Sequence, residues 1–152
     1  MSIAALLAWL VTATAGLYMF AVWLIEHDGS RGGGAGSRLR APVVFSHVTL
    51  AAAGLVVWVF YLYSDRSRLA WAAFLILLPV AVLGFIMLTR WIPVHRAANA
   101  SAAAAARAGS RPAGTIGPPE RNFPVPVVVA HGLFAVVTIV LVGLTTFGIF
   151  SA

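Results

Sequence analysis

Four long apolar runs constrain this chain more than any other feature of its sequence. They cover approximately residues 3–25, 43–63, 69–92 and 125–150 of the 152 residues. A helix needs about 20 apolar residues to cross the hydrocarbon core of a bilayer, and each run is at least that long. The sequence therefore predicts an all-α integral membrane protein, folded as a single four-helix transmembrane bundle over residues 1–152.

The composition agrees with a membrane protein and excludes several other classes. Hydrophobic residues make up 61% of the chain and charged residues 9%, whereas about a quarter of a soluble domain is charged. There is no cysteine, which excludes disulfides, thiolate metal sites and thiol redox chemistry. The first run has no basic segment before it and is longer than the apolar part of a signal peptide, so we expect it to be a membrane helix.

The arginines predict the orientation of the bundle. All basic residues behind the net charge of +6 are arginines, and they flank the apolar runs, which argues against a nucleic-acid partner. Basic residues are enriched in cytoplasmic loops. The first and third connections and their adjoining helix ends carry Arg31, Arg38, Arg40, Arg90, Arg96, Arg107, Arg111 and Arg121, against Arg66 and Arg68 in the second. We therefore expect a multi-pass protein of a bacterial plasma membrane with both termini outside.

The connections differ in length and composition. Residues 29–37 are rich in glycine and predict a flexible linker, and no lysine follows them as a phosphate-binding loop would require. Pro93 is expected to stop or kink the third helix. Within the cytoplasmic linker of residues 97–123, the alanine-rich part up to Arg107 is expected to continue as a short helix, and residues 109–119 are expected to be irregular.

Two sequence patterns occur twice. Pro42, His47 and Ala51 match Pro126, His131 and Ala135 at one constant offset along the chain. A second match has a shorter constant offset and relates Gly16, Met19, Trp23 and His27 to Gly84, Met87, Trp91 and His95. The chain therefore looks like a duplicated helical hairpin, with repeats at about 3–63 and 69–150, related by an axis along the membrane normal.

All four histidines fall at one end of the predicted bundle. His47 and His131 lie one to two turns inside the second and fourth helices, and His27 and His95 lie at the membrane surface. A polar side chain within the membrane is costly and indicates a functional site. The alternative is a helix–helix hydrogen bond, for example from His47 to a backbone carbonyl. The equal depth of His47 and His131 in a repeated motif favours function.

Haem b is the leading candidate ligand. Two neutral imidazoles bind haem iron from opposite sides, and the second and fourth helices of such a bundle are diagonal neighbours, roughly 11–14 Å apart. We expect His47 and His131 to be the axial ligands. The small residues Ala51, Gly54 and Ala135 leave room for a flat ring, and Arg38, Arg40 and Arg96 lie where propionates would emerge. The small residues could instead serve close helix packing, and the arginines could instead be only a signal of membrane topology.

In these paired histidines the chain resembles four-helix b-type membrane cytochromes, such as the cytochrome b561 group and one half of a haem A synthase. The resemblance implies a haem b held by His47 and His131 and electron transfer near the cytoplasmic face, with quinol as a candidate donor. No glutamate stands near His47 in the second helix, so haem A synthase activity is not implied. No intramembrane histidine lies toward the outer side, so a single haem is expected.

Two alternatives remain open from the sequence. The first is a transition-metal ion, copper, zinc or iron, held by two to four of His27, His47, His95 and His131, in a protein of metal transport, sensing or assembly. The second is a structural subunit of a larger membrane complex or homo-oligomer, in which the histidines only join helices. The sequence indicates no particular enzymatic reaction.

Overall fold

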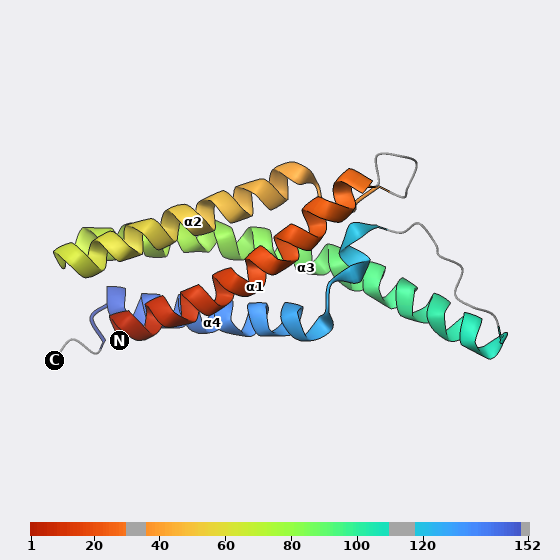
Figure 1. Ribbon diagram of the computed structural model, residues 1–152. Helices are drawn as coiled ribbons and strands as arrows, with labels where there is room; N and C mark the ends of the chain where they lie inside the picture. Colours follow the sequence, from red (N-terminus) through yellow and green to blue (C-terminus); the bar gives the residue numbers. More distant parts are fainter. Residues whose placement is uncertain (30–35, 110–117, 150–152) are drawn as a thin grey trace.

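The computed structural model describes residues 1–29, 36–109 and 118–149, without the side chains of residues 27–29. Its elements are α1 (Ser2–Gly29), α2 (Ala41–Ser64), α3 (Ser67–Arg107), the 3-10 helix η2 (Pro119–Asn122) and α4 (Val125–Thr146) (Figure 1). The described residues contain no strand. All four α-helices are long and apolar enough to cross a membrane. For the described residues, the prediction of an all-α chain with four helices of membrane-spanning length and composition is confirmed.

The helices α2 and α4 begin in the same way. Each follows an extended residue, Arg40 or Pro124, and carries a proline in its first turn. Proline is favoured there for two reasons. Backbone N–H groups in the first turn have no acceptor within the helix, so the lack of an N–H costs nothing, and the fixed φ of proline suits a helix. The repeated prolines thus mark the two helix starts, which lie equally far from His47 and His131.

The helix α3 is longer than the sequence predicted. It runs for 41 residues and contains both Pro79 and Pro93, so α3 does not stop at Pro93, although a stop was one of the two outcomes expected there. A proline removes one backbone hydrogen bond, and alanine, which dominates the segment that follows, has the highest helix propensity of any residue type. The predicted continuation up to Arg107 is confirmed, and it projects beyond the bundle (Figure 1).

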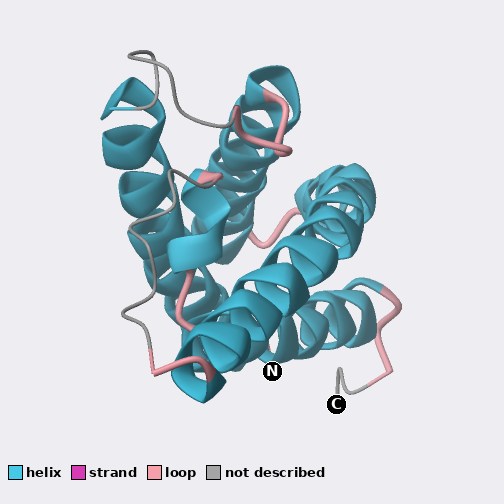
Figure 2. Cartoon of the chain, turned by 90° about the vertical axis from the view of Figure 1, so that its right-hand side faces the viewer, coloured by secondary structure: helices cyan, strands magenta, loops and turns pink. Residues whose placement is uncertain are grey.

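The four helices pack as two pairs. α1 packs mainly on α4, and α2 packs mainly on α3, with further contacts between α3 and α4 and between α1 and α2. α2 and α4 therefore face each other across the bundle, as the alternating helix directions predict (Figure 1). Figure 2 shows the same helices after a turn of 90°. We call the end with the long connections the loop end, and the end with the α2–α3 connection the turn end.

The core consists of two clusters. The turn-end cluster contains Ala5, Trp9, Trp58, Ala70, Ala73, Leu77 and Val142. The loop-end cluster contains Trp23, Leu39, Val44, Trp91 and Phe123. On the outside, large apolar side chains such as Phe60 and Phe85 are 62% and 66% exposed. Such a surface suits hydrocarbon rather than water.

Candidate functional site: paired histidines between two core clusters

His47 is held by the helix beside it. Its Nδ1 donates a hydrogen bond to the backbone carbonyl of Val80 on α3, at 3.0 Å. Its Cε1 lies against Gly84, one turn further along α3, where a Cβ atom would come within 3.2 Å of it. The missing side chain of Gly84 is what lets this imidazole lie on the α3 backbone.

His131 makes the corresponding contacts with α1. Its Nδ1 donates to the carbonyl of Thr12 at 2.9 Å, and a Cβ on Gly16 would come within 2.9 Å of its Cε1. Thr12 and Gly16 are related to Val80 and Gly84 by the offset of the second repeated pattern. Each imidazole is therefore held by the same two contacts, a hydrogen bond to a backbone carbonyl and packing against a glycine.

The two imidazoles face each other across the bundle. Their ring centroids are 6.3 Å apart, with an angle of 57° between the ring planes. Since a carbonyl only accepts, each neutral ring carries its proton on Nδ1, and Nε2 keeps its lone pair. Neither Nε2 has a hydrogen-bond partner in the part of the chain that the structure describes. Two basic nitrogens within the apolar bundle are thus left for a ligand.

The small residues predicted around the histidines have different surroundings. Ala51 and Ala135 are partly buried, one turn beyond His47 and His131. Gly54 instead lies against Trp9 and Ile76, with its Cβ position 3.1 Å and 3.2 Å from their side chains. Gly54 therefore makes room for the packing of the Trp9 indole on α2.

The predicted arginines lie outside the core. The side chains of Arg38, Arg40 and Arg96 are exposed at the loop end. The backbone of Arg38 is occupied, because its carbonyl accepts a hydrogen bond from Arg90 at 3.3 Å.

His95 lies apart from the central pair. Its ring stacks on Trp91, with centroids 4.9 Å apart, and its Nε2 is 2.9 Å from the Asn99 amide nitrogen. The side chain of His27 lies outside the described residues. Among the described side chains, no three His, Cys, Asp or Glu residues lie close enough together to bind one metal ion.

A buried carboxylate, which the sequence prediction missed, closes the loop end. Glu120 of η2 is fully buried. Its Oε2 accepts a hydrogen bond from the Ser37 hydroxyl at 2.9 Å, and its Oε1 accepts one from the Arg38 backbone N–H at 2.6 Å. The indoles of Trp23 and Trp91 donate to Ser37 Oγ and to the Glu120 carbonyl, at 3.1 Å and 3.0 Å. We call residues 37–39 and 119–123 together the loop-end cap.

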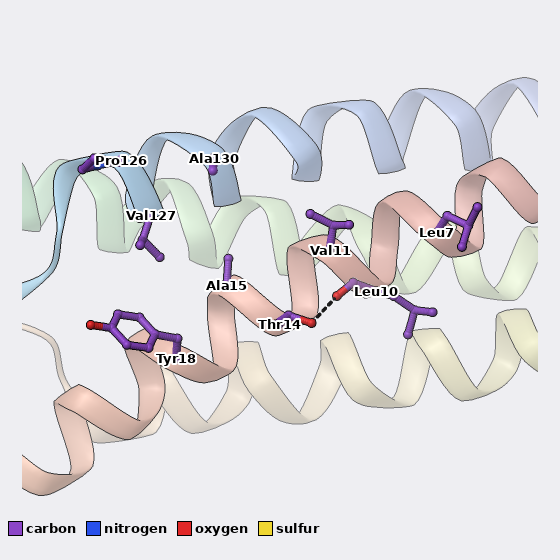
Figure 3. A pocket seen from close by; sticks show the side chains of 9 residues that line it. All are labelled: Leu7, Leu10, Val11, Thr14, Ala15, Tyr18, Pro126, Val127 and Ala130. Atoms are coloured by element: carbon purple, nitrogen blue, oxygen red, sulfur yellow. Dashed lines mark hydrogen bonds between the residues drawn. The ribbon is translucent and has the colours of Figure 1, made fainter.

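A shallow groove on the outer face of the α1–α4 pair is separate from the histidine site (Figure 3). Its volume is about 620 Å³. Apolar side chains line most of it, and the Thr14 hydroxyl donates to the Leu10 carbonyl of its own helix. The lining residues are Leu7, Leu10, Val11, Thr14, Ala15, Tyr18, Pro126, Val127 and Ala130. Its open, apolar character is that of a surface facing acyl chains.

Comparisons with protein-family models, with curated proteins and with solved structures found no match to this chain. The histidine pair is therefore the feature of the molecule that indicates a function. The glycines and carbonyl acceptors that hold the pair were not predicted as site residues. The repeat contained a signal for Gly16 and Gly84, because both recur at the same offset as the aromatic and histidine positions of the second pattern.

Proposed function

We propose that the protein is a small b-type membrane cytochrome in which His47 and His131 bind the iron of one haem b. The observation that carries the proposal is the pair of unpartnered Nε2 atoms on two rings whose centroids are 6.3 Å apart. A metal–imidazole bond is about 2.0–2.1 Å long, so two trans imidazoles hold their bonded nitrogens about 4 Å apart and their centroids roughly 6 Å apart. The observed ring separation fits that arrangement.

The choice of haem over a bare metal ion depends on the number of ligands. Protein sites for zinc and similar ions take three or four side-chain ligands, and the described residues bring only two histidines together. A haem needs two axial nitrogens and supplies the other four itself. Two histidines on opposite helices therefore suit a haem better than they suit a metal-transport or metal-sensing site.

A purely structural role explains only part of the geometry. The bonds from Nδ1 to Val80 and Thr12 would join helices in a structural subunit as well. A structural role does not explain why each Nε2 lacks a partner, because an unsatisfied polar atom within a membrane protein costs free energy. The free nitrogens are the feature that favours a ligand.

The residues around the pair have distinct roles in the proposed cytochrome. When bound, a haem would supply a one-electron redox couple. The carbonyls of Val80 and Thr12 orient the imidazoles and increase the basicity of their Nε2 atoms. The two core clusters, around Trp58 and Trp91, lie on either side of the pair and exclude water. Electron transfer would take place nearer the loop end, with a quinol in the bilayer as the candidate donor.

We also propose that the chain is a duplicated hairpin inserted with its loop end in the cytoplasm of a bacterium. The burial of matched residues supports the duplication. Ala5 and Ala73, related by the shorter offset, are both fully buried, and so are Trp58 and Val142, related by the longer one. The excess of arginines at the loop end supports the orientation.

An absorption spectrum of the purified protein tests the function. The wild type, produced with a haem supply, is expected to show a Soret band and sharpened α and β bands after reduction with dithionite. The variants His47→Ala and His131→Ala are expected to lose these bands. His95→Ala is the matched control, since His95 lies at the same end but away from the pair, and it should keep them.

Two other results would support the alternatives. A colourless wild type with one equivalent of copper, zinc or iron would favour the metal site. A colourless protein without metal would favour the structural subunit.

A further inference from the structure

The two ends of the bundle are closed in different ways. At the turn end, α2 and α3 are joined through Asp65 and Arg66 alone, and the fully buried Trp58 and Val142 pack between the helices. At the loop end, the closure is the loop-end cap, which is made of short non-α-helical segments. Opening the turn end requires separating helices, whereas among the described residues the loop end can open by displacement of the cap.

Hydrogen bonds to one carboxylate hold the loop-end cap together. Glu120 receives bonds from the Ser37 hydroxyl and the Arg38 N–H, so it connects the segment before α4 with the segment before α2. The indoles of Trp23 and Trp91 attach the same cluster to α1 and α3. All four helices are thus tied to the cap by Glu120 and the groups that it contacts.

The cap lies close to the paired histidines. His47 and His131 lie at equal depth in α2 and α4, about 9 Å along each helix from its first residue. The other end of α2, at Ser64, lies about 25 Å along the helix from His47. Val44, one turn from His47, belongs to the cluster beneath the cap. The shortest path from water to the histidines therefore crosses the cap.

We infer that the loop-end cap is where a planar cofactor passes from the aqueous side to His47 and His131, and that Glu120 holds this passage closed. The inference rests on the proposed haem site. A carboxylate bound by N–H and O–H donors makes strong hydrogen bonds, and a buried carboxylate that loses them is costly. The cap is therefore expected to be mostly closed and to open as one unit.

The test measures haem uptake by the apo-protein in lipid nanodiscs, followed by the growth of the Soret band after hemin is added. Glu120→Ala removes both side-chain hydrogen bonds and is expected to take up haem at least about tenfold faster than the wild type, since the loss of even one hydrogen bond to a charged group changes an opening equilibrium by about that factor. Glu120→Gln keeps one acceptor and should have a smaller effect. Glu26→Ala is the matched control, because Glu26 is an exposed carboxylate at the same end, and its uptake rate should be unchanged.

A second variant covers the case in which Glu120→Ala fails to fold. The chain has no cysteine, so the double variant Leu39→Cys, Phe123→Cys, which joins two cap residues of one core cluster and keeps Glu120, can be bridged across the cap with a short bifunctional thiol reagent. The bridged form should take up haem about tenfold more slowly than its unbridged form, because the bridge prevents the opening that a lost hydrogen bond would favour. A Val44→Cys thiol should react faster with a water-soluble maleimide when Glu120 is also replaced by Ala.

Wild-type uptake rates in both the Glu120→Ala variant and the bridged form would overturn the inference and indicate passage between helices from the bilayer. A wild type that never develops a Soret band would overturn the proposed function and the inference together. The two failures are therefore distinguishable.

Discussion

His47 and His131 belong to different hairpins of the chain, and their imidazole centroids lie 6.3 Å apart in the bundle. Each ring is anchored by a helix of the other hairpin: His47 by Val80 on α3, and His131 by Thr12 on α1. Neither hairpin can therefore position its histidine alone. The site forms only when α1 packs on α4 and α2 packs on α3.

The glycine beneath His131 provides the first prediction. In Gly16→Ala, the new Cβ would lie 2.9 Å from His131 Cε1, so the ring must move away from α1. Such overpacking costs about 1–3 kcal/mol, and we expect haem affinity, measured by titration of the apo-protein, to fall about tenfold or more.

Gly132→Ala is the matched control for this change. Gly132 is next to His131 in the chain, and its Cβ position has no atom within 4 Å. Because alanine favours a helix by about 1 kcal/mol over glycine, this variant should be slightly more stable than the wild type and keep its haem affinity. Equal affinities for Gly16→Ala and Gly132→Ala would show that the α1 surface does not position His131.

The second prediction concerns the turn-end cluster. Trp58 is fully buried, and its Nε1 donates to the Ser2 carbonyl at 3.3 Å. Trp58→Ala leaves a large cavity between helices and should lower the free energy of unfolding by about 3–5 kcal/mol. Denaturant titration in mixed micelles measures this loss. Phe60→Ala, at a 62% exposed ring of the same helix, should cost less than about 1 kcal/mol.

The third prediction concerns the part of α3 that projects from the bundle. Ala103 is exposed in this extension, and proline there removes a hydrogen bond and clashes with the preceding turn. Ala103→Pro should reduce helix content by circular dichroism and leave the thermal transition unchanged. Ala73→Pro, at a fully buried position of the same helix, should lower the transition strongly. A large drop in the transition for Ala103→Pro would reveal a role of the extension in stability.

The fourth prediction concerns orientation. Single cysteines are clean probes in a chain without cysteine, and Ser64 and Ser101 are exposed at opposite ends of the bundle, Ser64 at the turn end and Ser101 in the α3 extension. The excess of arginine at the loop end predicts that a membrane-impermeant maleimide labels Ser64→Cys in intact cells. Ser101→Cys should be labelled only after lysis. The reverse pattern would invert the proposed topology.

Much of the fold was predictable from local sequence. The lengths of the apolar runs predicted four helices, and Pro42 and Pro126 marked the starts of α2 and α4. These features are local because an apolar run must satisfy its own backbone hydrogen bonds in a bilayer, and a helix does so within the run. Pro93 does not end α3, because the helix-forming segment that follows it continues the helix.

The contacts of the site were less predictable. The contact of Gly54 with Trp9 was not predicted, and neither was the burial of Glu120. The direction in which a side chain points depends on which helices pair. In a membrane protein this is hard to read from sequence, because lipid and protein interior are equally apolar and the helices have little polar contrast around their axes.

The amino-acid sequence by itself determined that there are four helices long enough to cross a membrane, the equal depth of the two inner histidines and the excess of arginine at one end. Only the tertiary structure decided that each imidazole is held by a carbonyl and a glycine of the other hairpin, leaving both Nε2 atoms without a partner among the described residues. The physical reason is that helix length and histidine depth are properties of one segment, whereas the anchoring of a ring depends on contacts between segments distant in the chain.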